Sequence, residues 1–461
     1  MFGILLALLS SNGIPMSNKT IIILLTMMFG AAYAQDTAVM TLRDCIHYAL
    51  SHSAEMRVLQ ADLGDAQLAR RNAILNAFTP VISSDVYAYS NFGRSIDPET
   101  NTYSTTTSFH NGYGVSAGIT LFNGFRAVNN LKITKLAEAT GVTRIQQSED
   151  RIRLATMEAY CNVLYYTELL KTLQSQTETA EAALRLAQRQ RELGQKSPAD
   201  VLQMEADLSD RRYRFIVCEN QLQNAYITLK DIMLYPTEQP FSVTDVETDT
   251  VLSDAVRAME VSRAAERLPA VIIAENERQT ARLALKTAKW QLLPSLSLYG
   301  GWSSTYFTYP GRADYVPVPY WRQLSDNGGE YVQLSLSIPI YDRLSRQTEI
   351  ARRRNDCDRA EARYAQARQT VEAEIHRALA DRDGAAAALR QAEQHAALQQ
   401  QLYVLSTKQF EQGLISALDY QTVADNHLNA TAELLNAKLQ LFLKTWVVRY
   451  YFQLRMQNSE L

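Results

Sequence analysis

Two long stretches of this chain keep apolar residues three and four positions apart and contain almost no helix-breaking residues. From 126 to 193, and again from 343 to 412, there is no proline and one glycine, Gly141 and Gly384 respectively. A helix of either length would be about 100 Å long. After the first stretch the same spacing continues through Val201, Met204, Leu208, Arg211, Phe215, Cys218, Leu222, Ala225, Leu229 and Ile232. A strict 3.5-residue period predicts helices that supercoil against a neighbour.

The two long helices end in the same short motif. A glycine, which can take the left-handed conformation that ends a helix, is followed by a serine that can cap the next helix and an aspartate at its third position. We therefore predict two tight αα-hairpins: helices 124–193 and 198–235, and helices 342–412 and 417–450. The aspartates have two interpretations, helix capping and pore lining. The residues in these roles are Gly194 and Gly413, Ser197 and Ser416, and Asp200 and Asp419.

Four segments of about ten residues alternate apolar and polar side chains instead. They lie at 81–90, 113–122, 295–302 and 331–340, and Asp85 is their only charged residue. Alternation over this length is typical of transmembrane β-strands, whereas a soluble sheet normally carries charges on its polar face. The spacing from Pro80, compared with that from Pro294, places Asp85 on the polar face. Aromatic residues near the strand ends suggest two interfacial girdles: Tyr89, Tyr113, Trp302 and Tyr331 at one end, Phe122 and Tyr341 at the other.

Four strands cannot close a barrel, and open sheet edges are not tolerated in lipid. The sequence therefore predicts that several chains contribute strands to one barrel. Three copies would supply twelve strands, an allowed size.

The chain is an internal duplication with an offset of 219 residues, since Gly194 corresponds to Gly413 and Phe122 to Tyr341. Residues 1–34 have the pattern of a secretory signal peptide, with cleavage before Gln35 and with Met1 or Met16 as the start. The first repeat, 35–253, is expected to contain a helix, a β-hairpin at 81–122, the first helical hairpin and an equatorial segment at 236–253. The second repeat, 254–461, is expected to contain a helix, a β-hairpin at 294–340, the second helical hairpin and a C-terminal tail.

Composition excludes several classes of function. The net charge of −3 gives no field for nucleic acid, and we expect no nucleic-acid partner. The six histidines show no metal-binding spacing, and the four cysteines are expected to be small, unpaired and buried. No nucleophile elbow, phosphate-binding loop or metal triad occurs, so we expect no enzyme, no cofactor and no metal site.

These features, in this order and duplicated, resemble the TolC-type outer-membrane efflux factor family from about Thr41 to about Phe452. The resemblance implies an α+β membrane protein. Its trimeric β-barrel, with four strands from each chain, would lie in the cell outer membrane and in contact with its lipid. The barrel would continue into a long α-helical barrel that extends into the periplasm.

The implied function is that of the channel component of a tripartite efflux or type I secretion system. The homotrimer would be a passive conduit from periplasm to exterior. Its helical tips would dock a periplasmic membrane-fusion adaptor, and an inner-membrane pump of the RND or ABC type would act through that adaptor.

The resemblance also assigns site residues. The docking tips would include Gly194, Ser197, Gly413 and Ser416; Asp419 and Asp200 would line the pore constriction, and Asp85 the barrel lumen. Some relatives latch the closed tip through a tyrosine and an arginine. This chain has Phe410 and Ile415 at those places, which cannot form the same bonds; Lys408 or Arg191 could substitute.

A soluble periplasmic coiled-coil adaptor or scaffold is the alternative interpretation. It explains the heptad pattern and the export signal, but it does not explain four nearly uncharged strands with aromatic ends.

Overall fold

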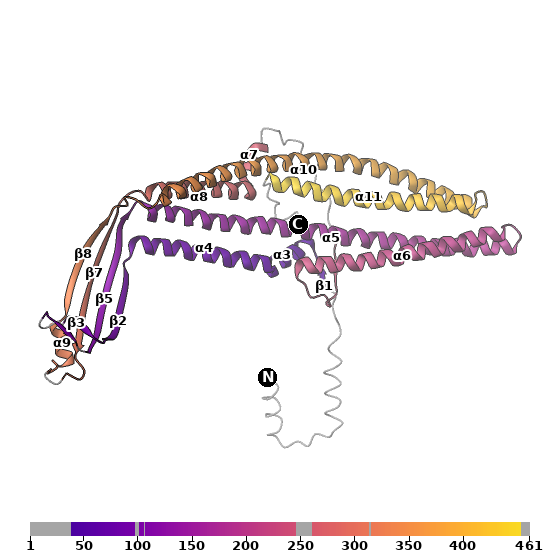
Figure 1. Cartoon of the computed structure of the whole chain (residues 1–461). Helices are drawn as coiled ribbons and strands as arrows, with labels where there is room; N and C mark the ends of the chain where they lie inside the picture. The colour runs from indigo at the N-terminus through magenta and orange to yellow at the C-terminus, as the bar shows by residue number, and fades with distance from the viewer. Residues whose placement is uncertain (1–37, 97–100, 106, 246–260, 313–314, 453–461) are drawn as a thin grey trace, which may run out of the picture.

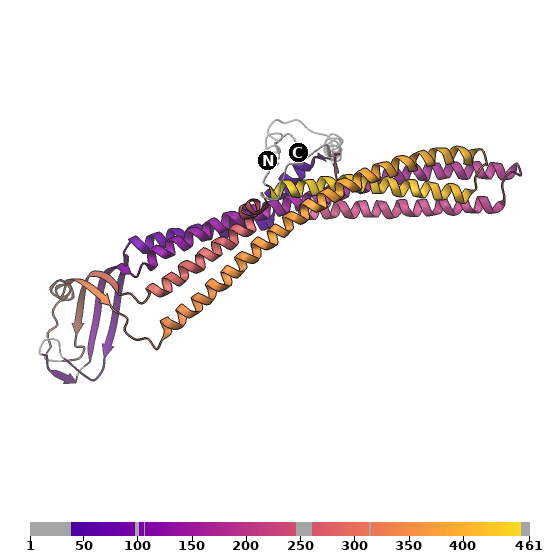
Figure 2. The same cartoon turned by 90° about the horizontal axis from the view of Figure 1, so that it is seen from above.

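The computed structural model describes residues 38–96, 101–105, 107–245, 261–312 and 315–452. The molecule is long and narrow, with a β-sheet at one end and helices that run away from it to a pair of hairpin tips (Figures 1 and 2). The predicted signal peptide, residues 246–253 of the predicted equatorial segment and the tail after Phe452 lie outside the described residues.

The main sheet has four antiparallel strands in the order β2-β5-β7-β8. Their bounds are β2 Val81–Asn91, β5 Ser108–Asn123, β7 Ser295–Thr308 and β8 Gly329–Ser337. Asp85 pairs with Gly114, and Gly114 pairs with Ser303. Because residues directly opposite each other share a face, Asp85 lies on the face that also carries Ser83, Ser116, Ser297, Gln333 and Ser335. The predicted polar face is confirmed.

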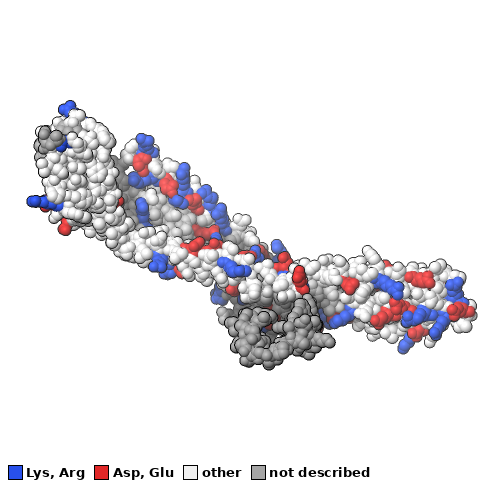
Figure 3. All heavy atoms as spheres, turned by 90° about the horizontal axis from the view of Figure 1, so that it is seen from below, with Lys and Arg blue, Asp and Glu red and all other residues white. Residues whose placement is uncertain are grey.

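The opposite face is apolar and largely exposed. It carries Ile82, Val86, Val115, Leu298, Trp302, Val332, Leu334 and Leu336. Within a single chain Ile82, Val332 and Leu334 are 71, 83 and 63% exposed. Figure 3 shows the sheet end almost free of charge, whereas charged residues crowd the helices.

The strand predictions were wrong in four details. Two strands are longer than predicted, since β5 begins at Ser108 rather than at 113 and β7 ends at Thr308 rather than at 302. The last strand ends at Ser337, short of the predicted 340, because Pro339 has no N–H to donate to a ladder. A bulge at Leu121 turns Phe122 onto the apolar face, where it pairs with Leu296. The girdle of four aromatic residues is divided between the faces: Tyr113 and Trp302 lie on the apolar face, Tyr89 and Tyr331 on the polar one.

The four long helices match their predicted bounds to within three residues. They are α5 Arg126–Glu192, α6 Pro198–Met233, α10 Ser345–Glu411 and α11 Ala417–Tyr451. Helices α5 and α6 form one hairpin and α10 and α11 the other, and the two lie side by side to their tips (Figures 1 and 2). None of the helices among the described residues has both the length and the apolar character needed to cross a membrane.

Each repeat was predicted to begin with one helix, and each begins with two. The first is divided into α3 Leu42–His52 and α4 Ala54–Phe78, because Ser53 leaves the helical conformation and its side chain accepts the N–H of Met56. The second is divided into α7 Val261–Arg267 and α8 Pro269–Trp290, since Pro269 can only begin a helix.

The main core surrounds the middle of α5. Met157, Tyr160 and Val163 are fully buried and pack with side chains of α3, α6 and α11. A short parallel pair, β1 Ala38–Met40 with β6 Phe241–Val243, closes this core. The Tyr160 hydroxyl donates to the carbonyl oxygen of Thr244 at 2.6 Å.

Three short elements complete the far end of the sheet. Strands β3 Arg94–Ile96 and β4 Tyr103–Thr105 form a small hairpin, and α9 Tyr320–Asp326 lies in the loop between β7 and β8. The sequence did not predict these elements, nor β1 and β6. The four cysteines are unpaired as expected; Cys45, Cys161 and Cys218 are buried, but Cys357 is only partly buried.

Candidate functional site

The two tips have nearly the same backbone. Gly194 and Gly413 both have φ of +73°, in the left-handed region. The next N–H groups, from Gln195 and Leu414, donate back to the carbonyl oxygens of Gln190 and Gln409 at 2.8 Å. The left-handed glycine and the backward hydrogen bond that follows it end both long helices in the same way. No neighbouring atom lies near either glycine, so the φ value alone demands glycine there.

The capping bonds differ between the tips. At the first tip Asp200 accepts from both the backbone N–H and the hydroxyl of Ser197, at 3.0 and 2.9 Å. At the second tip Asp419 accepts only from the hydroxyl of Ser416, at 2.7 Å. Both serines accept the aspartate N–H in return. The capping interpretation is therefore confirmed for Asp200, which forms a full capping box. At the second tip the carboxylate of Asp419 reaches the Ser416 hydroxyl but not its backbone N–H.

The difference in bonding has an electrostatic consequence. The hydrogen bond from the backbone N–H of Ser197 lowers the pKa of Asp200 most, and the bond from the Ser197 hydroxyl lowers it further. Asp419 is exposed and retains acceptor capacity for another group.

The tips of the two hairpins are joined by an aromatic junction that the sequence did not predict. Phe410 is 2% exposed and its ring stacks on that of Tyr420, with centroids 4.8 Å apart. Lys196, from the other hairpin's turn, places its Nζ 4.0 Å from the centre of the Phe410 ring. Lys196, rather than Lys408 or Arg191, therefore contacts the phenylalanine, and Ile415 packs against the same cluster.

A buried ionic network joins the hairpins further from the tips. Arg211 on α6 is 3% exposed; its Nε donates to Asp207 at 3.0 Å and its Nη1 to Gln176 of α5 at 2.8 Å. Its Nη2 lies 3.7 Å from Asp425 of α11. Burial raises the pKa of Asp425, and the cations Arg211 and Arg214 oppose that shift. The heptad stripe contained Arg211 but gave no sign of its partners.

Exposed leucines at the tips are a second feature that the sequence analysis missed. Leu193, Leu202, Leu414 and Leu418 are 73, 65, 69 and 61% exposed. Each tip thus presents two large apolar side chains close to its glycine turn, which is unusual for a surface that meets only water. These leucines lie outside the heptad stripe, so their position in the sequence could have indicated an exposed apolar surface at the tips.

The predicted site residues form two groups at opposite ends of the molecule. The turn residues and both aspartates lie at the hairpin tips, and Asp85 lies in the sheet (Figure 1). Among the described residues no group of three or more His, Cys, Asp or Glu side chains is arranged to hold a metal ion.

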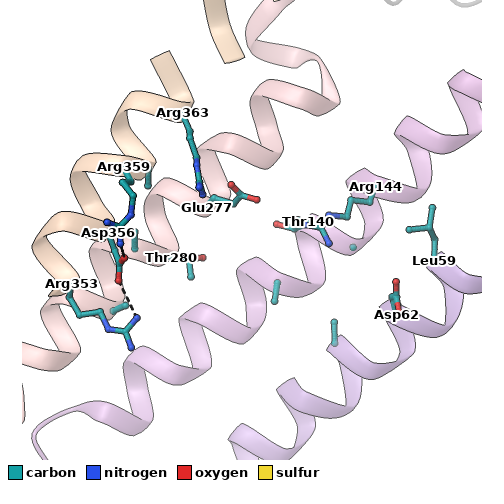
Figure 4. A pocket seen from close by; sticks show the side chains of 16 residues that line it. Leu59, Asp62, Thr140, Arg144, Glu277, Thr280, Arg353, Asp356, Arg359 and Arg363 are labelled. Carbon is teal, nitrogen blue, oxygen red and sulfur yellow. Dashed lines mark hydrogen bonds and ion pairs between the residues drawn. The ribbon is translucent and has the colours of Figure 1, made fainter. Parts of the chain in front are cut away.

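A groove of about 580 Å³ crosses helices α4, α5, α8 and α10 between these ends (Figure 4). Its lining carries both charge signs: Arg353 and Arg359 both pair with Asp356, and Arg144, Arg363, Asp62 and Glu277 also line it. Such a mixture favours neither anions nor cations.

Three solved structures with the same fold are distant from this chain in sequence. VceC, an outer membrane protein of Vibrio cholerae, aligns with a TM-score of 0.75 at 15% identity, over 89% of this chain and 95% of that one. CusC gives 0.76 at 15%, over 89 and 91%. The CmeC outer membrane channel of Campylobacter jejuni gives 0.74 at 17%, over 89 and 85%. No curated protein matches the chain.

A sheet with an exposed apolar face that continues into two very long helical hairpins is thus the fold of outer-membrane channel subunits. The outer membrane efflux protein family model matches residues 45–233 and 261–443. The chain belongs to that family, and its place is the outer membrane, with the helices extending into the periplasm.

Proposed function

We propose that three copies of this chain form a passive conduit across the outer membrane, as the channel component of a tripartite efflux or type I secretion system. Twelve strands would close one barrel, with Asp85 facing its lumen, and the helical hairpins would form a hollow periplasmic barrel. The chain would need no cofactor and catalyse no reaction.

The incomplete sheet is the observation that supports this proposal most strongly. Strands β2 and β8 are edges, and β8 runs opposite to β2, so an antiparallel ladder can continue from one chain's β8 to the next chain's β2. The apolar face could not remain in water, nor the edges in lipid. A barrel that further copies close would pair the edges, and its place in the membrane would cover the apolar face with lipid.

Two exposed apolar stripes on the hairpins support the same assembly. The stripe on α10 consists of Leu398, Leu402 and Leu405, which are 61, 48 and 53% exposed. The stripe on α6 consists of Tyr213, Ile216 and Ile227, which are 66, 62 and 53% exposed. Leucines spaced four and three residues apart are typical of a coiled-coil seam, yet within the described part of the chain these three remain largely exposed.

Cysteine pairs across the open edges test the barrel. In a variant without the native cysteines, Val86→Cys on β2 is combined with Val332→Cys or Leu334→Cys on β8. Oxidation of the membrane-embedded protein should give covalent dimers and trimers on a non-reducing gel. The control moves the first cysteine to Ala117 on the inner strand β5 and should give none. Monomers from every edge pair would contradict the barrel.

At the other end, we infer that the tips bind a periplasmic membrane-fusion adaptor, through which an inner-membrane pump of the RND or ABC type drives export. The apolar Leu193, Leu202, Leu414 and Leu418 beside the glycine turns support a protein partner. The Lys196–Phe410 contact would hold the hairpins together where relatives use a tyrosine and an arginine.

Asp419, together with Asp200, would line the periplasmic constriction. Three copies of an exposed carboxylate near a symmetry axis would attract cations. In planar bilayers Asp419→Asn should weaken block by multivalent cations while trimer formation is unchanged. Asp200→Asn, whose carboxylate is already engaged by two hydrogen bonds, should change the block less. Unchanged block in Asp419→Asn would leave that residue with capping alone.

The soluble scaffold remains the alternative, and it accounts for the hairpins equally well. It would leave the apolar sheet face in water. A mature chain that stays in solution as a monomer or elongated dimer without detergent would favour it over the conduit.

A further inference from the structure

Helix α9, Tyr320–Asp326, buries one polar side chain, Gln323, and exposes its largest apolar one, while Arg322, Ser325 and Asp326 are also exposed. Gln323 is 5% exposed, whereas Trp321 is 79% exposed and Arg322 lies beside it on the outer surface. In water a short helix at the end of a sheet should bury the tryptophan rather than the glutamine. The outward side of α9 therefore has the character of a surface that meets something other than bulk water.

The buried side of α9 is firmly attached to the sheet. The Gln323 amide donates to the carbonyl oxygen of Phe307 and accepts its N–H, both at 3.0 Å, so it replaces a strand along β7 beyond the end of β8. The hydroxyl of Ser304 donates to the carbonyl oxygen of Leu324 at 2.6 Å. These bonds fix the direction in which Trp321 points.

The contacts also show which face of the sheet α9 covers. The Tyr320 hydroxyl is hydrogen-bonded to the Tyr113 hydroxyl at 2.6 Å and donates to Oδ1 of Asn111 at 2.7 Å. The centre of its ring lies 4.7 Å from that of Tyr306. Asn111, Tyr113, Ser304 and Tyr306 all belong to the apolar face by register. Trp321 therefore projects on the same side as Val86, Trp302 and Leu334.

The depth of α9 along the sheet matches the edge of a membrane. Nine residue steps separate Ser295, where β7 begins, from Ser304, where α9 attaches. At ~3.3 Å per residue the strand covers ~30 Å, and a tilt of 35–45° reduces this to ~23 Å of height, close to the ~25 Å apolar band of outer-membrane barrels. Tryptophan and arginine are residues suited to the boundary between headgroups and acyl chains.

We propose that α9 is an interfacial anchor whose outward surface, centred on Trp321, sits in the headgroup boundary of the outer leaflet. The occupant is lipid, because this surface continues the apolar face that the proposed barrel presents to lipid. The inference rests on the proposed function, and the experiment separates the two.

Spin labels in lipid vesicles measure the depth of single sites. In the variant without native cysteines, Trp321→Cys and, separately, Leu334→Cys are labelled with a nitroxide and reconstituted in phosphatidylcholine–phosphatidylglycerol vesicles. Collision with oxygen, which concentrates in acyl chains, is compared with collision with a water-soluble nickel chelate. The expected result is a deep lipid site at Leu334 and a shallow interfacial site at Trp321.

The other outcomes overturn one proposal or both. Leu334 in lipid with Trp321 in water would remove the anchor and leave the conduit. A label at Trp321 that is immobile and shielded from both reagents would place it against a neighbouring chain, which also overturns the anchor. A label at Leu334 in water would remove the barrel and the anchor together.

A label-free measurement guards against disturbance by the nitroxide. The contribution of Trp321 to the fluorescence is obtained by subtracting the emission of Trp321→Phe from that of the native protein. Brominated lipids should quench this difference, and more strongly with bromine near the headgroup than near the chain end. No quenching from either position would contradict the anchor.

Discussion

The long helices α5 and α10 are copies of one another with 67 residues each, yet the chain treats them differently. Sixteen residues of α5 are buried but only seven of α10. The first copy is surrounded near its middle by α3, α6, β6 and α11, whereas the buried residues of α10 are few and scattered. Val371 and Ile375 pack with α7 and α8, and Phe410 packs in the cluster at the tip. A duplicated sequence pattern thus supplies one helix that its own chain largely surrounds and a second that is mostly exposed within the single chain.

The largest test of this contrast compares equivalent positions 219 residues apart. Tyr160→Ala removes a fully buried ring and its bond to Thr244, and should lower the free energy of unfolding by about 3–5 kcal/mol. Leu379→Ala, at the corresponding place on partly buried α10, should lower it by about 1 kcal/mol. Thermal unfolding followed by circular dichroism in detergent measures both. If both variants lost the same free energy of unfolding, the difference in burial between α5 and α10 in the single chain would not correspond to a difference in their contribution to stability.

The next test concerns the junction between the copies. Arg211→Met leaves the carboxylate of Asp207 buried with no cation and should cost about 3–5 kcal/mol. Combining it with Asp207→Leu should recover most of that loss, since no isolated charge remains. Arg214→Met is the matched control: its side chain is 39% exposed, so its loss should stay within about 1 kcal/mol. A double variant no better than Arg211→Met would contradict a purely electrostatic origin.

The sequence predicted the long helices well because local signals define them. No proline lies inside α5 or α10, and each has a single interior glycine. The glycine, serine and aspartate of each turn act within a few residues, and the seven-residue stripe can be recognised without knowing the partner helix. The face that carries Asp85 was predictable for the same reason, since the two-residue period of a strand is local.

The features that the sequence did not predict depend on contacts between distant residues. Lys196 meets Phe410, 214 positions away, only because the supercoil brings the tips together. The supercoil likewise brings Arg211 to Asp425. At the sheet end, the loop between β7 and β8 brings Tyr320 to Asn111, 209 positions away. Strands β5 and β7 extend beyond their predicted ends because they pair with each other through segments without alternation, a choice made by the register and not by the residues alone.

The smallest expected effect concerns a carboxyl group on α5 that is buried within the chain, that of Asp150. The Asp150 side chain is 15% exposed and lies 3.5 Å from Arg153; burial raises its pKa to about 6, against the pull of that arginine. Between about pH 4 and pH 6 the folded state therefore holds a proton that the unfolded state has released, so the free energy of unfolding falls as pH rises. Above pH 6 both states are ionised and the penalty is constant. The corresponding residue of the second copy is Gln369, which is exposed and has no such penalty.

Asp150→Asn should therefore leave stability unchanged near pH 4 and raise it progressively to about 1–3 kcal/mol above pH 6. Urea unfolding at a series of pH values measures the difference from the native protein. Glu149→Gln removes the neighbouring negative charge, a smaller cause of the raised pKa of Asp150, and leaves that carboxyl buried. It should therefore lower the pKa of Asp150 slightly without removing the penalty, so a comparison of the two variants separates burial from the charge of Glu149. An advantage of Asp150→Asn that is the same at every pH would show that Asp150 is solvated in the assembled protein, and that the burial of α5 is shallower than the single chain indicates.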